Sequence, residues 1–461
     1  MRRIKEILLS KIGAAILLLS AVLVLCLFTC CTPVYNVPLQ TNSPEPVSFI
    51  DQDSTTLIIF TASGGGTRAA ATSYRVLKEL EKITYLYTRG TFHTKTNLMK
   101  EIDIASGISG GSFPVAALGL GNGMLDSLRK NFIEKDIQGA LLKSMWVPPR
   151  IIRMMSPYYD RINLASEYYD KHIFYRKTFA DIKPFPRTWI NGSLLAIGYR
   201  LTYTQEFFDY IDSDLSKYPV AYACAASSAF PGLLNPITLK NYGVTLPDSV
   251  LKEDIRYEMA LLNSRRSLPQ YHYARMRRFL NDKKNAWLHI ADGGLVDNQG
   301  LQGVVDAWTT NNGVINREIN NPPYLKRIII INVNAGVAPI DKSCEKQNAP
   351  YLLDVLGYTM TTSMDILSAK RWEEIKGLAK ELYKAKIDLP TNPIWANLEK
   401  PYLIEVSFRN IVDPVLREQC NKLPTNFHLK KEQLQLIDDV VPTLLKEDPD
   451  MQRLLKILEK D

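Results

Sequence analysis

The pentapeptide Gly107-Ile-Ser-Gly-Gly111 constrains the fold of this chain more than any other part of its sequence. It follows a short strand-like stretch that begins at Ile102 and precedes an apolar run, 113–120, that is typical of a helix with Pro114 in its first turn. The outer glycines allow a sharp turn, and a helix N-terminus favours the negative charge that develops during acyl transfer. A serine held in this way forms a nucleophile elbow. The pattern therefore predicts an α/β fold with Ser109 as a nucleophile.

A second glycine-rich run, Ser63-Gly-Gly-Gly-Thr-Arg68, comes directly after the apolar strand pattern 57–61 and opens the helical pattern 67–83. Three consecutive glycines let backbone N–H groups point outward together, which suits an anion. A phosphate-binding loop is the alternative, but no Gly-Lys-Ser/Thr follows, and the Rossmann spacing lacks its acidic residue about 20 positions on. With a serine nucleophile in the chain, an oxyanion hole fits better. The candidate donors are Gly64, Gly65 and Gly66.

A third motif, Asp292-Gly-Gly294, follows the strand pattern 287–291. An aspartate at the carboxyl end of a strand, freed by two glycines, can aim its carboxylate into the place where α/β sheets bind their ligands. A turn-forming Asp-Gly pair is the alternative interpretation. The presence of the other two motifs favours a functional carboxylate at Asp292.

These motifs, together with the proline-bearing stretch Ala225-Ala-Ser-Ser-Ala-Phe-Pro-Gly232, resemble the patatin-like phospholipases, whose sequence blocks stand in the same order. The resemblance covers residues 55–333 and does not extend to the C-terminal third. Arg68 and the run 106–112 also resemble the related cytosolic phospholipase A branch, in which the arginine is thought to help hold the substrate phosphate. Nothing in the sequence resembles that branch's calcium-binding membrane domain.

The resemblance implies a three-layer α/β/α core with a mostly parallel central sheet, and a Ser109–Asp292 dyad in place of a triad. Asp292 would act as general base on Ser109, which attacks an ester carbonyl, and the N–H groups of Gly65 and Gly66 would stabilise the oxyanion. Water activated by Asp292 would then release the acyl group. The other motif glycines are Gly107, Gly111, Gly293 and Gly294. We expect no cofactor and no metal.

Two histidines allow a test of the rival Ser-Asp-His triad, in which the histidine follows the acid along the chain. His289 lies three residues before Asp292 within the strand pattern, and we expect it to pack in the core. His428 is the only late candidate, and a surface or capping role is expected for it. The sequence therefore favours the dyad.

The N-terminal segment, 1–31, has the pattern of a targeting signal. Four cations precede or open an apolar run, 12–28, that ends close to the cysteine pair Cys30-Cys31. This resembles a bacterial lipoprotein signal with Cys30 or Cys31 as the lipidated residue, although the residue before either cysteine departs from the usual small one. An uncleaved signal anchor is the alternative, because roughly 17–20 apolar residues can just span a bilayer. Both interpretations predict an exported, membrane-tethered body in the cell envelope.

The remaining cysteines, Cys224, Cys344 and Cys420, are odd in number and lack metal-ligand spacing, which argues against a disulfide framework or a zinc site. The net charge of +8 is mild, and the chain carries no basic low-complexity arm. Nucleic-acid binding is therefore a weak interpretation.

The pattern along the chain predicts a linker at 32–54, a catalytic domain at 55–338 and a mostly helical extension at 339–461. Within the extension we expect helix over 352–382, a strand over 402–408, and helix over 430–460 broken by Pro442. An insertion at about 248–285 is rich in arginine and lysine. It is either a solvated helical face or a surface that meets anionic lipid head groups.

From these observations we expect a membrane-tethered serine acyl hydrolase that acts on phospholipids or related acyl esters. Acyl transfer to an alcohol through the same acyl-enzyme is one alternative. A non-catalytic lipid-binding lipoprotein is another, but the complete set of Ser109, Asp292 and the glycine run argues against it. The sequence does not identify the head group, the acyl length or the oligomeric state.

Overall fold

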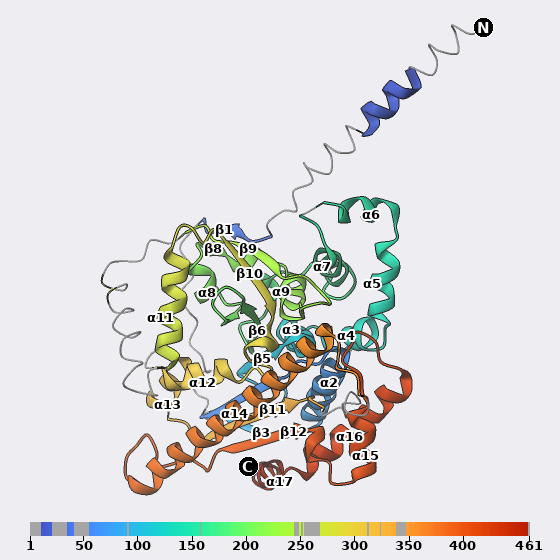
Figure 1. The fold of residues 1–461 in the computed structure, drawn as a ribbon. Coiled ribbons are helices and arrows are strands. Elements are labelled where there is room, and N and C mark those ends of the chain that lie inside the picture. Colours follow the sequence, from blue (N-terminus) through green and yellow to red (C-terminus); the bar gives the residue numbers. More distant parts are fainter. Residues whose placement is uncertain are drawn as a thin grey trace, which may run out of the picture.

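One mixed sheet of eight strands forms the centre of the protein, and helices cover both of its faces (Figure 1). The computed structural model describes residues 11–20, 35–40, 55–89, 92–156, 158–243, 249, 252, 268–310, 313–322, 324–337 and 347–459. The lipidation candidates Cys30 and Cys31, and residues 253–267 of the insertion at 248–285, lie outside these residues.

The strand order explains how the sheet carries the site. Its order is β12 (Tyr402–Ser407), β11 (Arg327–Asn334), β2 (Thr56–Ala62), β5 (Ile104–Ile108), β6 (Arg187–Leu194), β10 (Trp287–Asp292) and β9 (Ile237–Lys240), with β7 (Tyr199–Thr202) also paired to β6. The run from β12 to β6 is parallel, whereas β7, β9 and β10 pair in antiparallel fashion. This confirms the expected mostly parallel centre. The edge strand β12 comes from residues beyond the predicted catalytic domain.

The central strands are buried on both faces, as their continuous apolar runs predict. In β2, Ile58 and Phe60 pack into one core, while Leu57 and Ile59 pack into a second core on the other side. Alternation of side chains along a strand requires this division. The sheet is therefore the middle of three layers, which confirms the expected α/β/α core.

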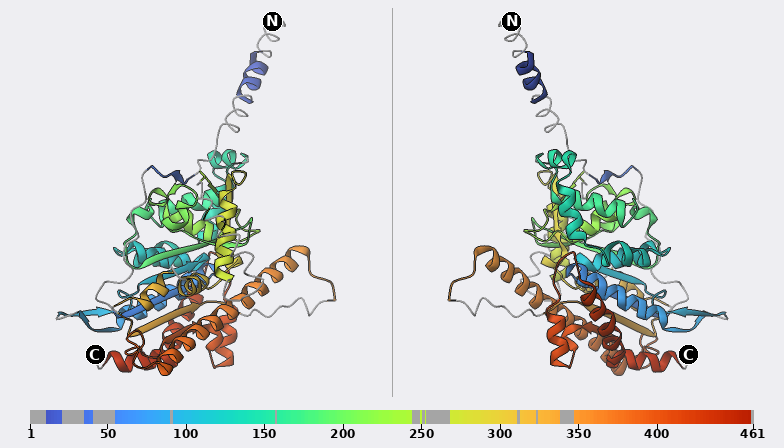
Figure 2. Two further views of the ribbon diagram at one scale, coloured as in Figure 1. Left: turned by 90° about the vertical axis from the view of Figure 1, so that its left-hand side faces the viewer. Right: turned by 90° about the vertical axis from the view of Figure 1, so that its right-hand side faces the viewer.

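Each core is completed by its own set of helices. The larger core packs against α2 (Gly66–Lys82), α3 (Ser112–Leu120), α7 (Arg161–His172), α9 (Val220–Ser227), α11 (Leu268–Asn281), α16 (Lys431–Glu447) and α17 (Pro449–Leu458). The smaller core packs against α12 (Gln302–Thr309), α13 (Val314–Asn320) and α14 (Leu352–Asp388). Figure 2 shows the N-terminal part of α14 projecting from the body on the side opposite the β3–β4 hairpin.

The remaining strands and α-helices lie outside the sheet. They are β1 (Val37–Pro38), β3 (Thr84–Arg89), β4 (Phe92–Asn97), β8 (Ser213–Asp214), α4 (Met124–Leu128), α5 (Ile137–Met145), α6 (Pro148–Met154), α8 (Gln205–Asp209) and α15 (Pro414–Asn421). Residues 11–20 also form a helix. Of the helices in the described parts of the chain, none combines the length and the apolar character needed to cross a membrane.

The expected break at Pro442 is wrong. Pro442 lies inside α16, which continues to Glu447. The chain turns instead at Asp448, whose carboxylate accepts the N–H groups of Asp450 and Met451, and Pro449 occupies the first position of α17. The apolar face of α16 stays buried on both sides of Pro442, and this packing keeps the helix continuous there. The next helix begins where an aspartate cap is followed by a proline, because both residues favour a helix start.

Candidate active site

Ser109 lies where β5 ends and turns into α3, as the elbow motif predicts. Its φ is +48°, in the left-handed region that residues with a side chain rarely adopt. The conformation is held on both sides: the Ser109 N–H donates to Ser227 Oγ at 2.8 Å, and the Ser109 carbonyl accepts from Ser112 Oγ at 2.5 Å. Such strain is typical of functional sites whose surroundings fix the residue.

The motif glycines allow two backbones to approach each other. A Cβ on Gly111 would lie 2.5 Å from the Ser63 carbonyl oxygen, and one on Gly107 would lie 2.7 Å from Ser112 Cα. A Cβ on Gly110 would overlap the carbonyl oxygen of Gly66. The elbow is thus pressed against the glycine run, and the middle glycine of the motif, which the sequence analysis did not single out, makes the tightest approach.

Asp292 reaches the same place from the opposite direction. It is the last residue of β10, which runs antiparallel to β6 and pairs Asp292 with Gly192. The neighbouring Asn191 is paired across β6 with Ile108, the residue before the nucleophile. This register brings the Asp292 carboxylate close enough to Ser109 for the serine side chain to lower its pKa.

Ser109 and Asp292 are both shielded from water. Ser109 is 7% exposed and Asp292 is 3% exposed. Burial raises the pKa of Asp292 to about 7, although its hydrogen bonds with the Gly294 N–H, 2.8 Å long, and with Ser109 oppose the rise. A carboxylate with this pKa is a much better base near neutral pH than an ordinary aspartate.

The glycine run supplies two N–H groups beside the nucleophile. Gly64 lies against Ser109, since a Cβ there would be 3.3 Å from Ser109 Cβ, but its own N–H already donates to the Asn298 carbonyl at 2.9 Å. Gly65 and Gly66 both have positive φ, and their N–H groups have no acceptor among the described residues. The geometry therefore removes Gly64 from the candidate oxyanion donors and leaves the other two.

Arg68 is placed differently from the expectation of a phosphate ligand. It is buried, with Nε donating to the Ala335 carbonyl at 2.8 Å and Nη1 donating to the Leu423 carbonyl at 2.7 Å. Burial lowers its pKa to about 10, so it remains charged at neutral pH. Two of its nitrogens are committed to the backbone, and only Nη2 approaches Gly65. Arg68 thus mainly fixes the glycine run in place.

The chain segment that carries the elbow, the glycine run and the aspartate also matches a family model. The model for patatin-like phospholipase matches residues 61–304, more than half of the chain. This chain belongs to the patatin-like phospholipase family.

Among solved structures, human GIVD cytosolic phospholipase A2 is similar to this patatin-like protein at 11% sequence identity, with a TM-score of 0.44. The match covers 89% of this chain and 64% of that one, so the chain spans just under two thirds of the phospholipase's length. A comparison with the curated proteins finds no match.

Three further residues of the patatin-like site were missed by sequence reasoning. Ser227 holds the Ser109 N–H and donates its own hydroxyl to the Asn191 carbonyl at 2.6 Å. Asn191 also donates to the Gly107 carbonyl at 3.1 Å, which fixes the start of the elbow. Asn298 holds Gly64. The only sequence signal was the position of Ser227 inside the proline-bearing stretch, because the other two act through contacts between distant segments.

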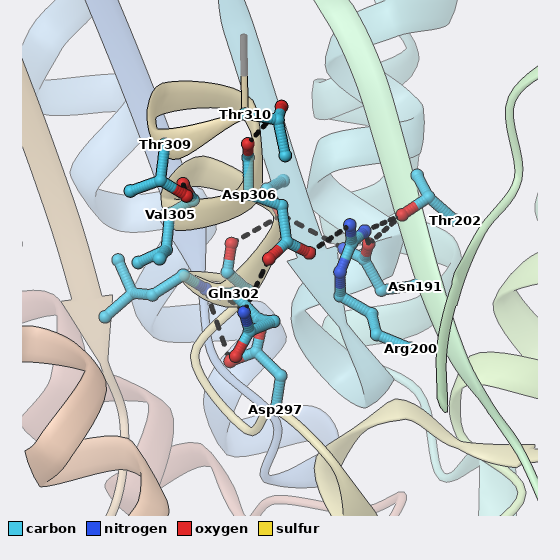
Figure 3. Close-up of polar contacts among 12 residues, drawn as sticks. Asn191, Arg200, Thr202, Asp297, Gln302, Val305, Asp306, Thr309 and Thr310 are labelled. Carbon is cyan, nitrogen blue, oxygen red and sulfur yellow. Dashed lines mark hydrogen bonds and ion pairs between the residues drawn. The ribbon is translucent and has the colours of Figure 1, made fainter. Parts of the chain in front are cut away.

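A partly buried ion pair lies next to these contacts. Arg200 donates to the Asn191 side-chain oxygen at 3.1 Å and pairs with Asp306 at 3.1 Å, so that it links β7 to α12 (Figure 3). Gln302 donates to Asp306 and also to Asp297, which sits in the loop that presents Asn298. One polar network therefore joins β6 and β7 to α12 and to the loop that carries Asp297 and Asn298.

The C-terminal helix α14 packs over the aspartate side of the site. A Cβ on Gly294 would lie 2.5 Å from Met364 Cε, and one on Gly293 would overlap the Asn191 carbonyl. Asp365 on the same helix pairs with Arg409 at 3.0 Å, and its charge acts on Arg68. Close approach to backbone therefore requires glycine at Gly293, whereas Gly294 lies against the flexible end of the Met364 side chain.

The two histidines do not complete a triad. His428 lies at the surface, as expected, with Nδ1 3.7 Å from Asp136. His289 was expected in the core, but it is exposed and its ring meets the Thr238 hydroxyl at 3.0 Å. The prediction for His289 is wrong because β10 is half-exposed at its beginning and becomes fully buried only near Asp292.

Proposed function

We propose that this protein is a membrane-tethered serine acyl hydrolase that cleaves the acyl esters of phospholipids through Ser109 and Asp292. The observation that carries the proposal is the strand register that brings the buried Asp292 beside the buried Ser109, with the Gly65 and Gly66 N–H groups next to them. Membership of the patatin-like family supports the choice of a lipid acyl ester as substrate.

In the first half-reaction, Ser109 Oγ attacks the ester carbonyl carbon while Asp292 takes the hydroxyl proton. The oxyanion of the tetrahedral intermediate accepts hydrogen bonds from Gly65 and Gly66. Collapse of the intermediate breaks the bond to the leaving alcohol, which receives the proton from Asp292. An acyl-serine and a free alcohol, such as a lysophospholipid, result.

In the second half-reaction, Asp292 removes a proton from water, and the resulting hydroxide attacks the acyl-serine carbonyl. Collapse returns the proton to Ser109 Oγ and releases the fatty acid. Because Asp292 alternates between base and acid, a pKa of about 7 suits both roles near neutral pH.

The test compares the wild type with Ser109→Ala and Asp292→Asn on a soluble short-chain ester and on phospholipid vesicles. Each substitution should lower the rate by on the order of 10⁴-fold or more, as for other nucleophile and base deletions. Ser228→Ala is the matched control, because the Ser228 hydroxyl bonds only the carbonyls of Cys224 and Ala225. Full activity in Ser109→Ala, or no labelling of Ser109 by a fluorophosphonate, would reject the proposal.

The tether has its own test. If Cys30 or Cys31 carries the lipid, replacing both with serine should abolish incorporation of labelled palmitate into the full chain and release it from membranes. Retention in the membrane fraction without palmitate would favour the uncleaved anchor. Recovery of the wild type in the soluble fraction would reject tethering while leaving the hydrolase proposal untouched.

A further inference from the structure

Two short helices between α4 and α7 present an unusual apolar surface. Leu142 on α5, Val147 between the helices and Ile151 on α6 are exposed, and Trp146 is 78% exposed. Met155 and Tyr158 continue the exposure beyond α6. We call these six residues the α5–α6 face. Water-exposed apolar groups gathered on one segment mark an interaction surface.

The segment that carries this face bears charges of one sign only. Residues 137–158 contain Lys143, Arg150 and Arg153 and no aspartate or glutamate. Arg153 pairs with Glu167 at 2.7 Å, which leaves two cations for an outside partner. On the adjoining helix α7, burial together with the charges of Lys171 and Arg150 lowers the pKa of His172. Lys171 and Arg150 therefore both lie near His172. Cations that border a tryptophan-bearing apolar surface are typical of segments that lie in a membrane interface.

The chain after the predicted tether joins the body beside the same face. The described chain resumes at Tyr35, whose ring centroid lies 4.0 Å from that of Tyr222. Burial raises the pKa of Tyr35, and the charges of Glu167 and Arg153 also act on it, so the Arg153–Glu167 pair is close by. Figure 1 shows β1 and α6 at the same end of the molecule. A bilayer that holds the N-terminal segment would therefore meet this end.

The other end of α5 reaches the active site. The Ile137 and Gln138 N–H groups donate to the Phe427 carbonyl at 3.2 and 3.3 Å. The preceding carbonyl, that of Asn426, accepts the Thr67 N–H beside the oxyanion donors. The surface that would touch lipid and the loop that would bind the oxyanion are thus connected through two consecutive peptide groups.

We propose that the α5–α6 face docks on an anionic lipid bilayer, with Trp146 and Val147 in the head-group region and Lys143 and Arg150 against lipid phosphates. The proposal rests on the proposed membrane-tethered function. It assigns the surface to the bilayer rather than to a second copy of the chain, because the tether and the cations converge on this face.

The first test measures whether Trp146 enters the bilayer. Full-length Ser109→Ala protein is reconstituted into vesicles of equal parts phosphatidylcholine and phosphatidylglycerol, with or without brominated acyl chains that quench tryptophan. The quenching should fall clearly in Trp146→Phe. Trp287→Phe is the matched control, since Trp287 is 50% exposed on β10 and lies outside the face. Because this readout needs no turnover, it judges the face even if the protein proves inactive.

The second test measures what the face does for hydrolysis. Trp146→Ser/Val147→Ser/Met155→Ser should lower the rate on the same vesicles about tenfold, as loss of roughly 1.4 kcal/mol of interfacial binding would. The rate on a soluble short-chain ester should not change. Val412→Ser/Val415→Ser removes two exposed valines elsewhere and should leave both rates intact.

The proposal would be overturned by equal quenching in Ser109→Ala protein with and without Trp146→Phe, by an unchanged vesicle rate in the triple variant, or by a dimer in detergent that the triple variant dissociates. Loss of the soluble-ester rate in the triple variant would mean that the face acts on the site itself, and would also overturn it. An inactive wild type with strong Trp146 quenching would instead reject the proposed hydrolase and keep the face.

Discussion

The guanidinium of Arg68 donates a hydrogen bond to the carbonyl oxygen of Leu423 at 2.7 Å, which ties the glycine run of the site to the C-terminal region. Thr67 adds a second tie to the Asn426 carbonyl at 2.8 Å. A Cβ on Gly66 would overlap that same carbonyl. The segment 423–426 therefore belongs to the structural support of the site, although it lies more than a hundred residues beyond the family match.

Arg68→Met should lower the turnover of a soluble ester by about 10²-fold while the protein stays folded. The substitution leaves two buried carbonyls without their charged donor and frees the loop that presents Gly65, and one oxyanion donor is typically worth this much. Steady-state kinetics and thermal unfolding measure the two effects.

Arg453→Met is the control for this prediction, because Arg453 also donates to two backbone carbonyls, those of Lys400 and Pro401, away from the site. It should change stability more than activity. If both variants lose activity equally, the effect of Arg68 is general destabilisation.

The rate should rise with pH and level off above an apparent pKa near 7, because Asp292 must be ionised to accept the Ser109 proton. A pH profile of kcat/KM on an uncharged soluble ester tests this. An inflection near 4 would mean that the carboxylate behaves as if it were solvated, in contradiction to its burial.

Asp292→Asn should stabilise the folded protein at pH 8 and leave it nearly unchanged at pH 4. Burial raises the pKa of Asp292 from its ordinary value near 4 to about 7, so ionisation in the folded state costs free energy that grows between these two pH values. The full difference is on the order of 4 kcal/mol above pH 7. Urea unfolding at the two pH values measures it, and equal stabilisation at both would contradict the assigned cause.

Gly110→Ala should abolish activity without unfolding the chain. Its methyl group would overlap the Gly66 carbonyl oxygen and push the oxyanion donors away from Ser109. We expect a loss of at least about 10²-fold in turnover, since small displacements of positioned groups cost this much. Gly377→Ala on α14 is the control, because a Cβ there meets nothing within 4 Å and alanine favours a helix.

The local parts of the site could be predicted from sequence, and the parts made by distant contacts could not. Sharp turns need glycine at fixed positions, and these glycines made it possible to predict Ser109, Asp292 and the glycine run from the sequence. The antiparallel direction of β10 left no such mark, since a buried strand reads the same in either direction. Asn298 and Leu423 act through their backbone carbonyls, so their side chains carry no signal at all.

The dependence on the Leu423 and Asn426 carbonyls also determines when, during synthesis of the chain, the glycine run can be fixed in place. A protein is made from its N-terminus, so Ser109, the glycine run and Asp292 all exist long before residues 423–426 are added. Until those residues arrive, Arg68 and Thr67 have no acceptors there and the oxyanion donors are not yet fixed. The support of the glycine run is therefore complete only when synthesis of the chain is nearly finished.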